Sequence, residues 1–108
     1  AFEMSRACKN LIISTEKIVP TEEIREHPDR TIIPYYLVDA VVHAPYGSWP
    51  GEMSGMYERD EPHYKMFIEK QKTKEGMDEY MKEWLYAFND HQSLLDKVGK
   101  KRLQELTL

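Results

Sequence analysis

The stretch RACKNLIIST, residues 6–15, places an apolar run directly after a helical segment. Residues 1–9 have the pattern of a helix end, because Arg6 and Lys9 lie where cations favour the negative end of the helix dipole. The run at residues 11–13 is short, branched and bounded by polar residues, which predicts a buried strand of a mainly parallel sheet. A helix that leads straight into such a strand indicates α/β alternation.

The next elements continue this alternation. Thr21 is the expected N-cap of a short helix, which Pro28 ends because the residue before a proline disfavours the helical conformation. Residues 31–33 and 37–42 are the next extended candidates. Val38, Ala40 and Val42 alternate with Asp39, Val41 and His43, which fits a sheet edge or a strand between two layers.

Residues 44–57, APYGSWPGEMSGMY, are of a different kind. Three glycines and two prolines exclude regular structure there. The aromatic residues Tyr46, Trp49 and Tyr57 nonetheless predict packing on the same domain, on a partner or on a ligand. Composition leaves two interpretations open: a structural crossover whose aromatic rings fill a gap, or a loop that lines a site. Glycines allow a ligand to approach the backbone, and aromatic rings supply rigid contact area.

From residue 58 onward the pattern is helical. Asp60 is a suitable N-cap for a first helix, and residues 73–76 interrupt it. Apolar residues then recur at three- and four-residue steps from 77 to 88, which predicts an amphipathic helix with a packing face. Asp90 begins a last helix, which the interior Gly99 weakens by ~1 kcal/mol relative to alanine.

Composition excludes several classes of protein. The chain has 108 residues, 15 basic and 19 acidic side chains and a single cysteine, Cys8. A disulfide scaffold is therefore excluded, and the slight acidic excess argues against a nucleic-acid surface. No apolar run approaches the ~20 residues of a membrane-spanning helix. No signal peptide is visible, so we expect a cytoplasmic protein. The start at Ala1, without methionine, predicts a fragment, a processed product or the ordered part of a longer chain.

Three groups of reactive side chains have simple structural explanations. Cys8 is expected to be a small packed residue rather than a nucleophile. Asp60, Glu61 and His63 are better explained as a helix cap with a nearby surface histidine than as a metal site, since nothing supplies further ligands. The glutamates within residues 22–26 complement a helix dipole. No nucleophile elbow, phosphate-binding loop or dinucleotide fingerprint is present.

Several short pieces of this chain form one collinear series that resembles a known family. They are LIISTEKIV at 11–19, RTIIP at 30–34, VDAVV at 38–42, PYG at 45–47, and Pro50. The series resembles the C-terminal part of the A (alpha) subunit of family I CoA-transferases, of the glutaconate CoA-transferase type. The resemblance runs from about residue 7 to the helices near residue 95.

Three features depart from the family pattern. Ser48 and Trp49 occupy the places where the family loop commonly has Ala-His, and Tyr35 and Tyr36 stand where it tends to have Gly-Phe. These differences affect the expected acyl-group specificity more than the fold. The family's alpha subunit is also longer, and its glycine-rich N-terminal half is absent here. The chain therefore resembles a partial subunit.

The resemblance implies a chemistry and a partner. Family members move CoA from an acyl-CoA to a carboxylate by way of a mixed anhydride and a glutamyl-CoA thioester, a form of covalent catalysis. In the glutaconate type the nucleophilic glutamate belongs to the B (beta) subunit, and no glutamate of this chain matches that motif. We therefore assign no catalytic residue, no metal and no permanently bound cofactor. Related proteins use the same scaffold to hydrolyse acyl-CoA rings.

These observations combine into one prediction. The fold is α/β: the C-terminal part of a mainly parallel sheet with flanking helices (residues 1–57), followed by a helical tail (58–108), together one partial domain. The function is the alpha-subunit portion of a hetero-oligomeric CoA-transferase that acts on a small or dicarboxylic acyl-CoA. The expected cleft-lining residues, facing the beta subunit, are Tyr46, Gly47, Ser48, Trp49, Pro50 and Gly51, with Ser48 as a polar contact. The alternative is a non-catalytic interaction or regulatory module that docks through the 44–57 loop and the 77–88 face.

Overall fold

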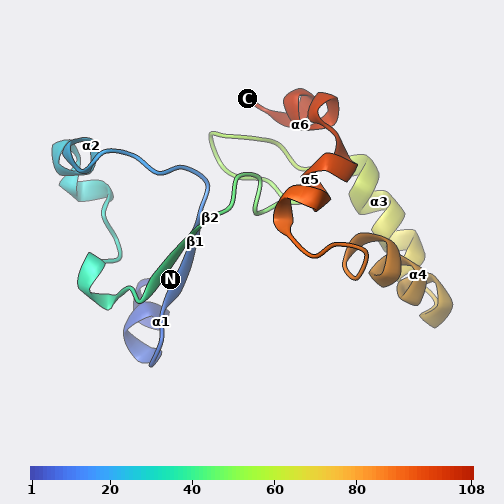
Figure 1. Cartoon of the computed structure of the whole chain (residues 1–108), viewed down its shortest axis with the longest axis horizontal. Coiled ribbons are helices and arrows are strands. Elements are labelled where there is room, and N and C mark those ends of the chain that lie inside the picture. The colour runs from blue at the N-terminus through green and yellow to red at the C-terminus, as the bar shows by residue number, and fades with distance from the viewer. The chain divides into compact units, whose positions relative to one another are not determined.

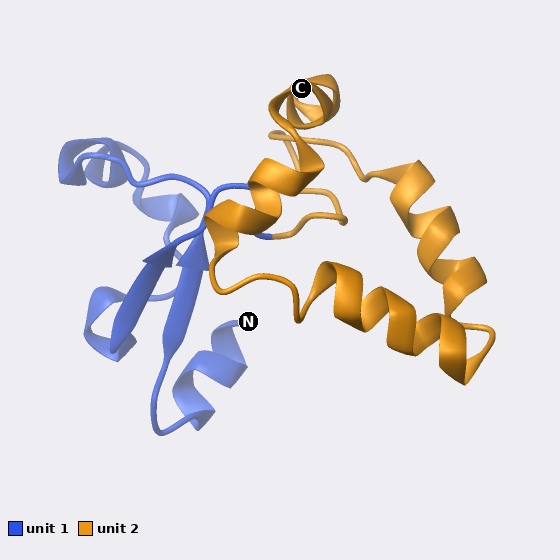
Figure 2. Cartoon of the chain, turned by 45° about the vertical axis from the view of Figure 1, so that its right-hand side comes forward, with its two compact units in different colours: residues 1–47 blue, residues 48–108 orange.

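The computed structural model describes residues 1–108, which form two compact units, Ala1–Gly47 and Ser48–Leu108. Figure 1 labels the elements and Figure 2 colours the two units. None of the helices has the length and apolar character that a membrane crossing requires.

Unit 1 is built around a parallel pair of strands. Its elements are α1 (Phe2–Ala7), β1 (Ile12–Thr15), α2 (Thr21–Glu26), the 3₁₀ turns η1 (Pro28–Arg30) and η2 (Tyr35–Leu37), and β2 (Ala40–His43). The strands pair in parallel, from Ile12 opposite Ala40 to Thr15 opposite His43. The carboxylate of Asp39 accepts a hydrogen bond from the Leu11 backbone N–H at 2.7 Å, which ties the strand starts together. The α/β class is confirmed.

Three local predictions in unit 1 are wrong. Residues 31–33 form no strand, and the second strand begins at Ala40 rather than at residue 37. The reason is that the chain after Pro34 turns into η2, and only the segment opposite β1 finds hydrogen-bond partners. Thr21 is also not the N-cap: Pro20 takes that position, so the Thr21 side chain makes no capping bond.

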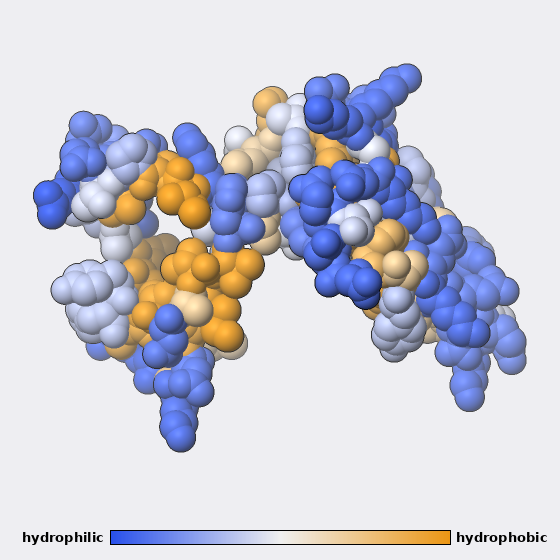
Figure 3. Space-filling view, viewed as in Figure 1, coloured by the Kyte–Doolittle hydropathy of each residue, from blue (hydrophilic) through white to orange (hydrophobic).

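The expected burial of the first strand is also wrong within this chain. Ile12 is 68% exposed, and Val41 on β2 is 59% exposed. Parallel sheets are normally covered on both faces, but this sheet has two strands and only Ser5 is buried in unit 1. Figure 3 shows apolar surface gathered where β1 and β2 lie. The sheet therefore has apolar faces that unit 1 itself leaves open.

Unit 2 consists of four helices, and three of them begin at a side-chain cap. They are α3 (Glu61–Lys70), α4 (Lys74–Trp84), α5 (His91–Val98) and α6 (Lys100–Leu106). The side chains of Asp60, Thr73 and Asp90 each accept a hydrogen bond from the N–H three residues on. The predicted caps at Asp60 and Asp90 are confirmed, because these bonds satisfy helix N–H groups that lack a partner within the helix.

The helix predicted over 77–88 ends earlier than its apolar pattern. α4 stops at Trp84, and the N–H groups of Leu85 and Tyr86 both donate to the Met81 carbonyl, which closes the last turn. Leu85 is consequently exposed.

Gly99 divides the predicted last helix into α5 and α6. Its φ of +91° is a backbone conformation that glycine adopts without strain and other residues rarely do. The Gly99 N–H closes α5 on Leu95, and its carbonyl accepts from Leu103 in the first turn of α6. The sequence predicted a weakened helix, whereas the structure has a break.

The core of unit 2 contains five buried apolar residues. The buried apolar residues are Tyr57, Tyr80, Leu95, Leu103 and Leu106. The backbone of Tyr57 bridges to both Met53 and Thr107, so it ties the irregular segment before α3 to the end of α6. This arrangement brings residues 48–60 against helices that lie far along the chain.

Candidate functional site

The predicted site loop begins at the end of unit 1. Tyr46 has a φ of +56°, in the left-handed region that bulky residues seldom adopt. Its N–H donates to the Glu16 carboxylate at 2.6 Å, which helps to hold this conformation. A Cβ on Gly47 would lie 2.8 Å from the Ala44 carbonyl oxygen, so the tight turn requires glycine. A strained backbone conformation such as that of Tyr46 costs ~1–3 kcal/mol, and such conformations are common at functional sites.

Residues 48–51 are the first residues of unit 2, and hydrogen bonds to other residues of unit 2 hold them in place. The Ser48 N–H donates to the Tyr57 hydroxyl at 3.0 Å, and the Gly51 N–H donates to the Ser48 carbonyl at 2.6 Å. The carbonyl of Pro50 accepts from the Asp60 N–H at 3.0 Å. The Trp49–Pro50 peptide bond is cis. The loop is therefore irregular, as predicted, and well supplied with hydrogen bonds.

Trp49 packs on its own unit. Its ring lies 4.4 Å from the His63 ring and 5.6 Å from the Trp84 ring, measured between centroids. Its indole N–H donates to the Asp60 carboxylate at 3.1 Å. The sequence predicted that the aromatic rings of this loop pack on the same domain, on a partner or on a ligand. Trp49 packs on the same domain.

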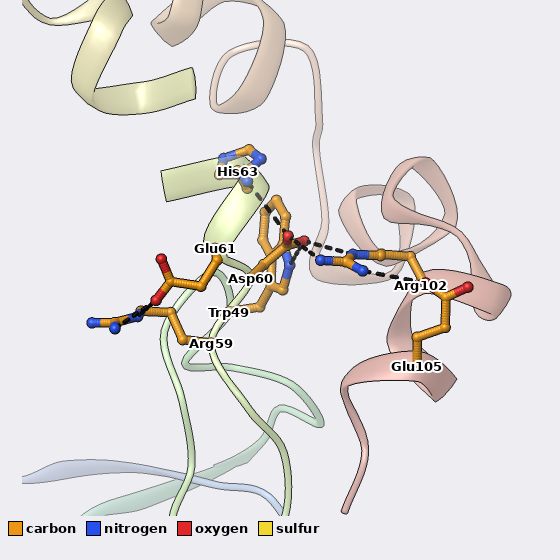
Figure 4. Close-up of polar contacts among 7 residues, drawn as sticks. All are labelled: Trp49, Arg59, Asp60, Glu61, His63, Arg102 and Glu105. Carbon is orange, nitrogen blue, oxygen red and sulfur yellow. Dashed lines mark hydrogen bonds and ion pairs between the residues drawn. The ribbon is translucent and has the colours of Figure 1, made fainter. Parts of the chain in front are cut away.

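Asp60 is the polar centre of the site (Figure 4). The residue is 4% exposed, and its carboxylate accepts hydrogen bonds from Trp49, from the His63 backbone N–H and from the Arg102 guanidinium. The Arg102 contact is the shortest, at 2.7 Å. Burial alone would raise the pKa of Asp60, but the hydrogen bonds from Arg102, Trp49 and His63 outweigh it and hold the pKa below its ordinary value. Asp60 is therefore an anion at neutral pH.

His63 is buried, although the sequence predicted a surface histidine. It is 6% exposed, its Nε2 lies 2.9 Å from the Tyr80 hydroxyl, and its ring stacks edge-on to Trp84 at 4.6 Å. Burial lowers the pKa of His63, while the charges of Asp60 and Glu83 act in the raising direction without reversing it. The ring is therefore neutral at pH 7. The sequence could not show this, because the residues that bury His63 come from a different helix and a loop.

Glu61 and Cys8 are both exposed. Glu61 pairs with Arg59 on the exposed side of the helix start, and Figure 4 shows this pair turned away from Asp60. No three His, Cys, Asp or Glu side chains of residues 1–108 converge on a common point. Cys8, expected to be packed, is exposed, because α1 ends at Ala7 and nothing in unit 1 covers the turn that follows.

A hollow of about 310 Å³ lies beside Trp49 in unit 2. Its wall includes Trp49, Asp60, His63, Trp84, Lys97 and Arg102. Both cations are already bonded: Arg102 to Asp60 and Glu105, and Lys97 to Glu83. A larger hollow of about 430 Å³, around residues 52–61 and Leu108, has only exposed charged groups in its wall, namely Glu52, Glu58, Arg59 and Glu61. We take the smaller hollow as the candidate site because it adjoins the predicted loop and contains the buried polar groups.

Comparison with known proteins gives a consistent result. The chain is 40% identical over 104 residues to the A subunit of glutaconate CoA-transferase from Acidaminococcus fermentans, covering 96% of this chain and 32% of that one. It is 26% identical over 98 residues to the A subunit of 3-oxoadipate CoA-transferase from Pseudomonas knackmussii, covering 91% and 34%. An uncharacterized protein of Archaeoglobus fulgidus is 47% identical over 106 residues, covering 97% and 24%. No family model matches the chain.

The fold agrees with these sequence matches. The crystal structure of glutaconate coenzyme A-transferase from Acidaminococcus fermentans superposes with a TM-score of 0.93 at 39% identity, covering 99% of this chain and 34% of that one. This chain spans about a quarter to a third of the length of the relatives it matches. The predicted resemblance is confirmed: over nearly its whole length, in sequence and in fold, the chain is similar to a section of the alpha subunit of CoA-transferases of the glutaconate type.

Proposed function

We propose that this chain is part of the alpha subunit of a CoA-transferase that moves CoA between an acyl-CoA and a small or dicarboxylic acid. The observation that carries the proposal is the joint match to glutaconate CoA-transferase, 40% identical in sequence and 0.93 in TM-score over nearly the whole chain. CoA thioesters are the substrates in this proposal, and no permanently bound cofactor is needed. CoA-thioester chemistry fits a cytoplasmic location.

In the proposed reaction the covalent steps belong to the beta subunit. A glutamate carboxylate of that partner attacks the acyl-CoA carbonyl carbon, and the C–S bond breaks to release CoA thiolate and leave a mixed anhydride. The thiolate then attacks the glutamyl carbonyl, which releases the acyl carboxylate and forms the glutamyl-CoA thioester. The acceptor carboxylate reverses these steps. Splitting the exchange in this way lowers each barrier.

The contribution of this chain is to bind and orient the acyl group. Residues 46–51 line the cleft toward the beta subunit, with the hydroxyl of Ser48 as a polar contact. The closely packed turn at Gly47 supports this role, because it keeps side-chain bulk away from the backbone. Trp49 supplies a rigid apolar wall that excludes water from the reacting thioester.

The open faces of unit 1 support the proposed assembly. Val41 and Ile12 are mostly exposed on a parallel sheet, an arrangement that proteins normally cover on both sides. We propose that the remainder of the alpha subunit covers them and that the beta subunit completes a hetero-oligomer.

The test uses the complete two-subunit enzyme with Trp49→His in its alpha subunit. We expect the ratio of kcat/KM among acyl-CoA donors of different size to change by about tenfold or more, because a changed wall discriminates between acyl groups of different size. The measurement is steady-state kinetics with a short donor series, together with the melting temperature. Tyr86→His is the matched control, since Tyr86 is an aromatic residue of the same unit that is 72% exposed. If Trp49→His lowers stability and leaves every ratio unchanged, the loop is a structural plug.

The second candidate is a non-catalytic interaction module. The exposed pair Tyr35 and Tyr36 in unit 1 favours it, because large exposed aromatic rings often mark a docking surface. Two aromatic residues of the docking surface predicted at 44–57 and 77–88 cannot contact a partner, because Tyr57 and Tyr80 are buried in unit 2. An acyl-CoA ring hydrolase is the third candidate. Assays of the complete enzyme with and without an acceptor acid distinguish transfer from hydrolysis.

A further inference from the structure

We propose that Asp60 is a positioning residue: it fixes the indole of Trp49 and thereby sets the acyl selectivity of the hollow beside it. The inference rests on the proposed function, because selectivity is the property that it explains. It assigns a role to a carboxylate that the sequence explains only as a helix cap.

The hydrogen bonds of Asp60 leave little freedom to its carboxylate. Oδ1 accepts from Arg102 Nη2 at 2.7 Å and from the His63 N–H at 3.4 Å. Oδ2 accepts from the Trp49 indole N–H at 3.1 Å and from Arg102 Nε at 3.4 Å. The guanidinium therefore contacts both oxygens, which fixes the plane of the carboxylate as well as its position.

The same residue holds Trp49 twice. The Asp60 carboxylate binds the edge of the indole, and the Asp60 backbone N–H donates to the carbonyl of Pro50, the residue after Trp49. The ring of His63 lies 4.4 Å from the indole ring. The backbone N–H of the same histidine donates a hydrogen bond to the Asp60 carboxylate. Rotation of the Trp49 ring would therefore break a hydrogen bond to a buried anion and lose a ring contact.

Arg102 makes the buried carboxylate compatible with a stable fold. The side chain of Asp60 is 6% exposed, and an unpaired buried carboxylate is strongly destabilising. Arg102 lies on α6, so its ion pair with Asp60 couples the position of the Trp49 ring to the position of that helix. Its third bonded nitrogen, Nη1, donates to Glu105, which holds the guanidinium from the other side.

The hollow consequently selects by shape rather than by charge. Arg102 and Lys97 are its cations, and both are already bonded to carboxylates. A carboxylate entering the hollow would share a cation that already neutralises another carboxylate, so its charge would gain little there. The apolar part of the wall consists of Trp49 and Trp84 together with Pro62, Met66 and Val98, so the size and branching of an acyl chain decide its fit.

The test compares Asp60→Asn with Glu61→Gln in the complete two-subunit enzyme. Glu61 is the matched control, because it is the adjacent acidic residue and its ion pair with Arg59 faces away from Trp49. Two properties are measured: the indole ¹⁵N–¹H resonance of Trp49, assigned by its loss in Trp49→Phe, and the ratio of kcat/KM between a short and a long acyl-CoA donor. We expect Asp60→Asn to shift that resonance and to change the ratio by about tenfold. Glu61→Gln should do neither.

A double-mutant cycle separates positioning from general destabilisation. Trp49→Phe keeps an apolar ring but removes the donor to Asp60, so Asp60→Asn should add no further change in the ratio on that background. If Asp60→Asn does not fold, Arg102→Lys replaces it in the same cycle, since lysine keeps the charge but loses the two-oxygen contact.

The outcomes distinguish this inference from the proposed function. Unchanged selectivity in Asp60→Asn, with changed selectivity in Trp49→His, would overturn the positioning role and leave the proposed function standing. Unchanged selectivity in both variants would overturn the cleft role of the loop, and with it the selectivity part of this inference. An additive effect of Asp60→Asn on the Trp49→Phe background would also overturn it, because Asp60 would then act on selectivity by another route.

Discussion

At the scale of the residue, His63 shows how burial changes the chemistry of a side chain. It is held between the Trp49 and Trp84 rings and the Tyr80 hydroxyl, and burial lowers its pKa from the ordinary 6.5. The charges of Asp60 and Glu83 oppose this shift only in part. Protonation of His63 therefore places a charge in an aromatic environment that solvates it poorly.

We predict that unit 2 loses stability as the pH falls below about 6.5. Below that value the unfolded chain binds a proton at His63 that the folded chain does not, so the free energy of unfolding decreases until the folded-state pKa is reached. Asp60, whose pKa is also lowered, adds a second loss only below about pH 3.8. Denaturant unfolding between about pH 5 and pH 8 measures the first slope.

His63→Gln should remove the slope in this range, and His91→Gln, a histidine at the start of α5, serves as its control. A slope that persists in His63→Gln would mean that another group titrates on unfolding.

At the scale of the element, Gly99 decides whether residues 91–106 form one helix or two. Helix propensity alone makes an interior glycine a weak point, which alanine would repair by ~1 kcal/mol. The structure instead has α5 and α6 joined at a φ of +91°, with no atom within 4 Å of the place that a Cβ would take. The substitution would therefore cost backbone strain and no steric clash.

We predict that Gly99→Ala lowers the free energy of unfolding by ~1–3 kcal/mol, because alanine is strained in this backbone conformation. Helix propensity alone therefore predicts that Gly99→Ala stabilises the chain, whereas the observed backbone conformation predicts that it destabilises the chain. Thermal or urea unfolding measures it, and Gln104→Ala in the exposed part of α6 controls for helix propensity. A gain in stability would show that the two helices can merge.

At the scale of the whole molecule, the two units differ in how well they bury their own apolar residues. Unit 2 buries five apolar side chains, whereas the only buried residue of unit 1 is Ser5. Unit 1 has a parallel sheet of two strands with open apolar faces. Local stability follows buried apolar contact, so the units should open with different free energies.

We predict that in the isolated chain the backbone amides of β1 and β2 exchange with solvent at least about tenfold faster than those of α6, because unit 1 leaves most of the sheet exposed. Hydrogen exchange followed by mass spectrometry measures this. In the proposed two-subunit enzyme the same strand amides should become protected. Equal protection of β2 and α6 in the isolated chain would contradict the prediction.

Features that depend on neighbouring residues could be predicted from the amino-acid sequence alone. The caps at Asp60 and Asp90, the irregular loop at 44–57 and the helix preceding a short apolar strand all follow from local steric and hydrogen-bonding rules. The ordered motifs from residue 11 to Pro50 were enough to predict the resemblance to the CoA-transferase alpha subunit. Each of these signals lies within a few consecutive residues, so no knowledge of distant contacts is needed to recognise it.

Features that depend on contacts between distant residues became visible only in the folded chain. Arg102 reaches Asp60 across 42 positions, and Tyr80 reaches His63 across 17, separations at which no spacing rule applies. The exposure of Ile12 was also invisible, because a branched strand has the pattern of a buried one whether its covering layer is in the chain or outside it. Residue type determines what a side chain can do in water, and only the residues folded around it determine whether water is there.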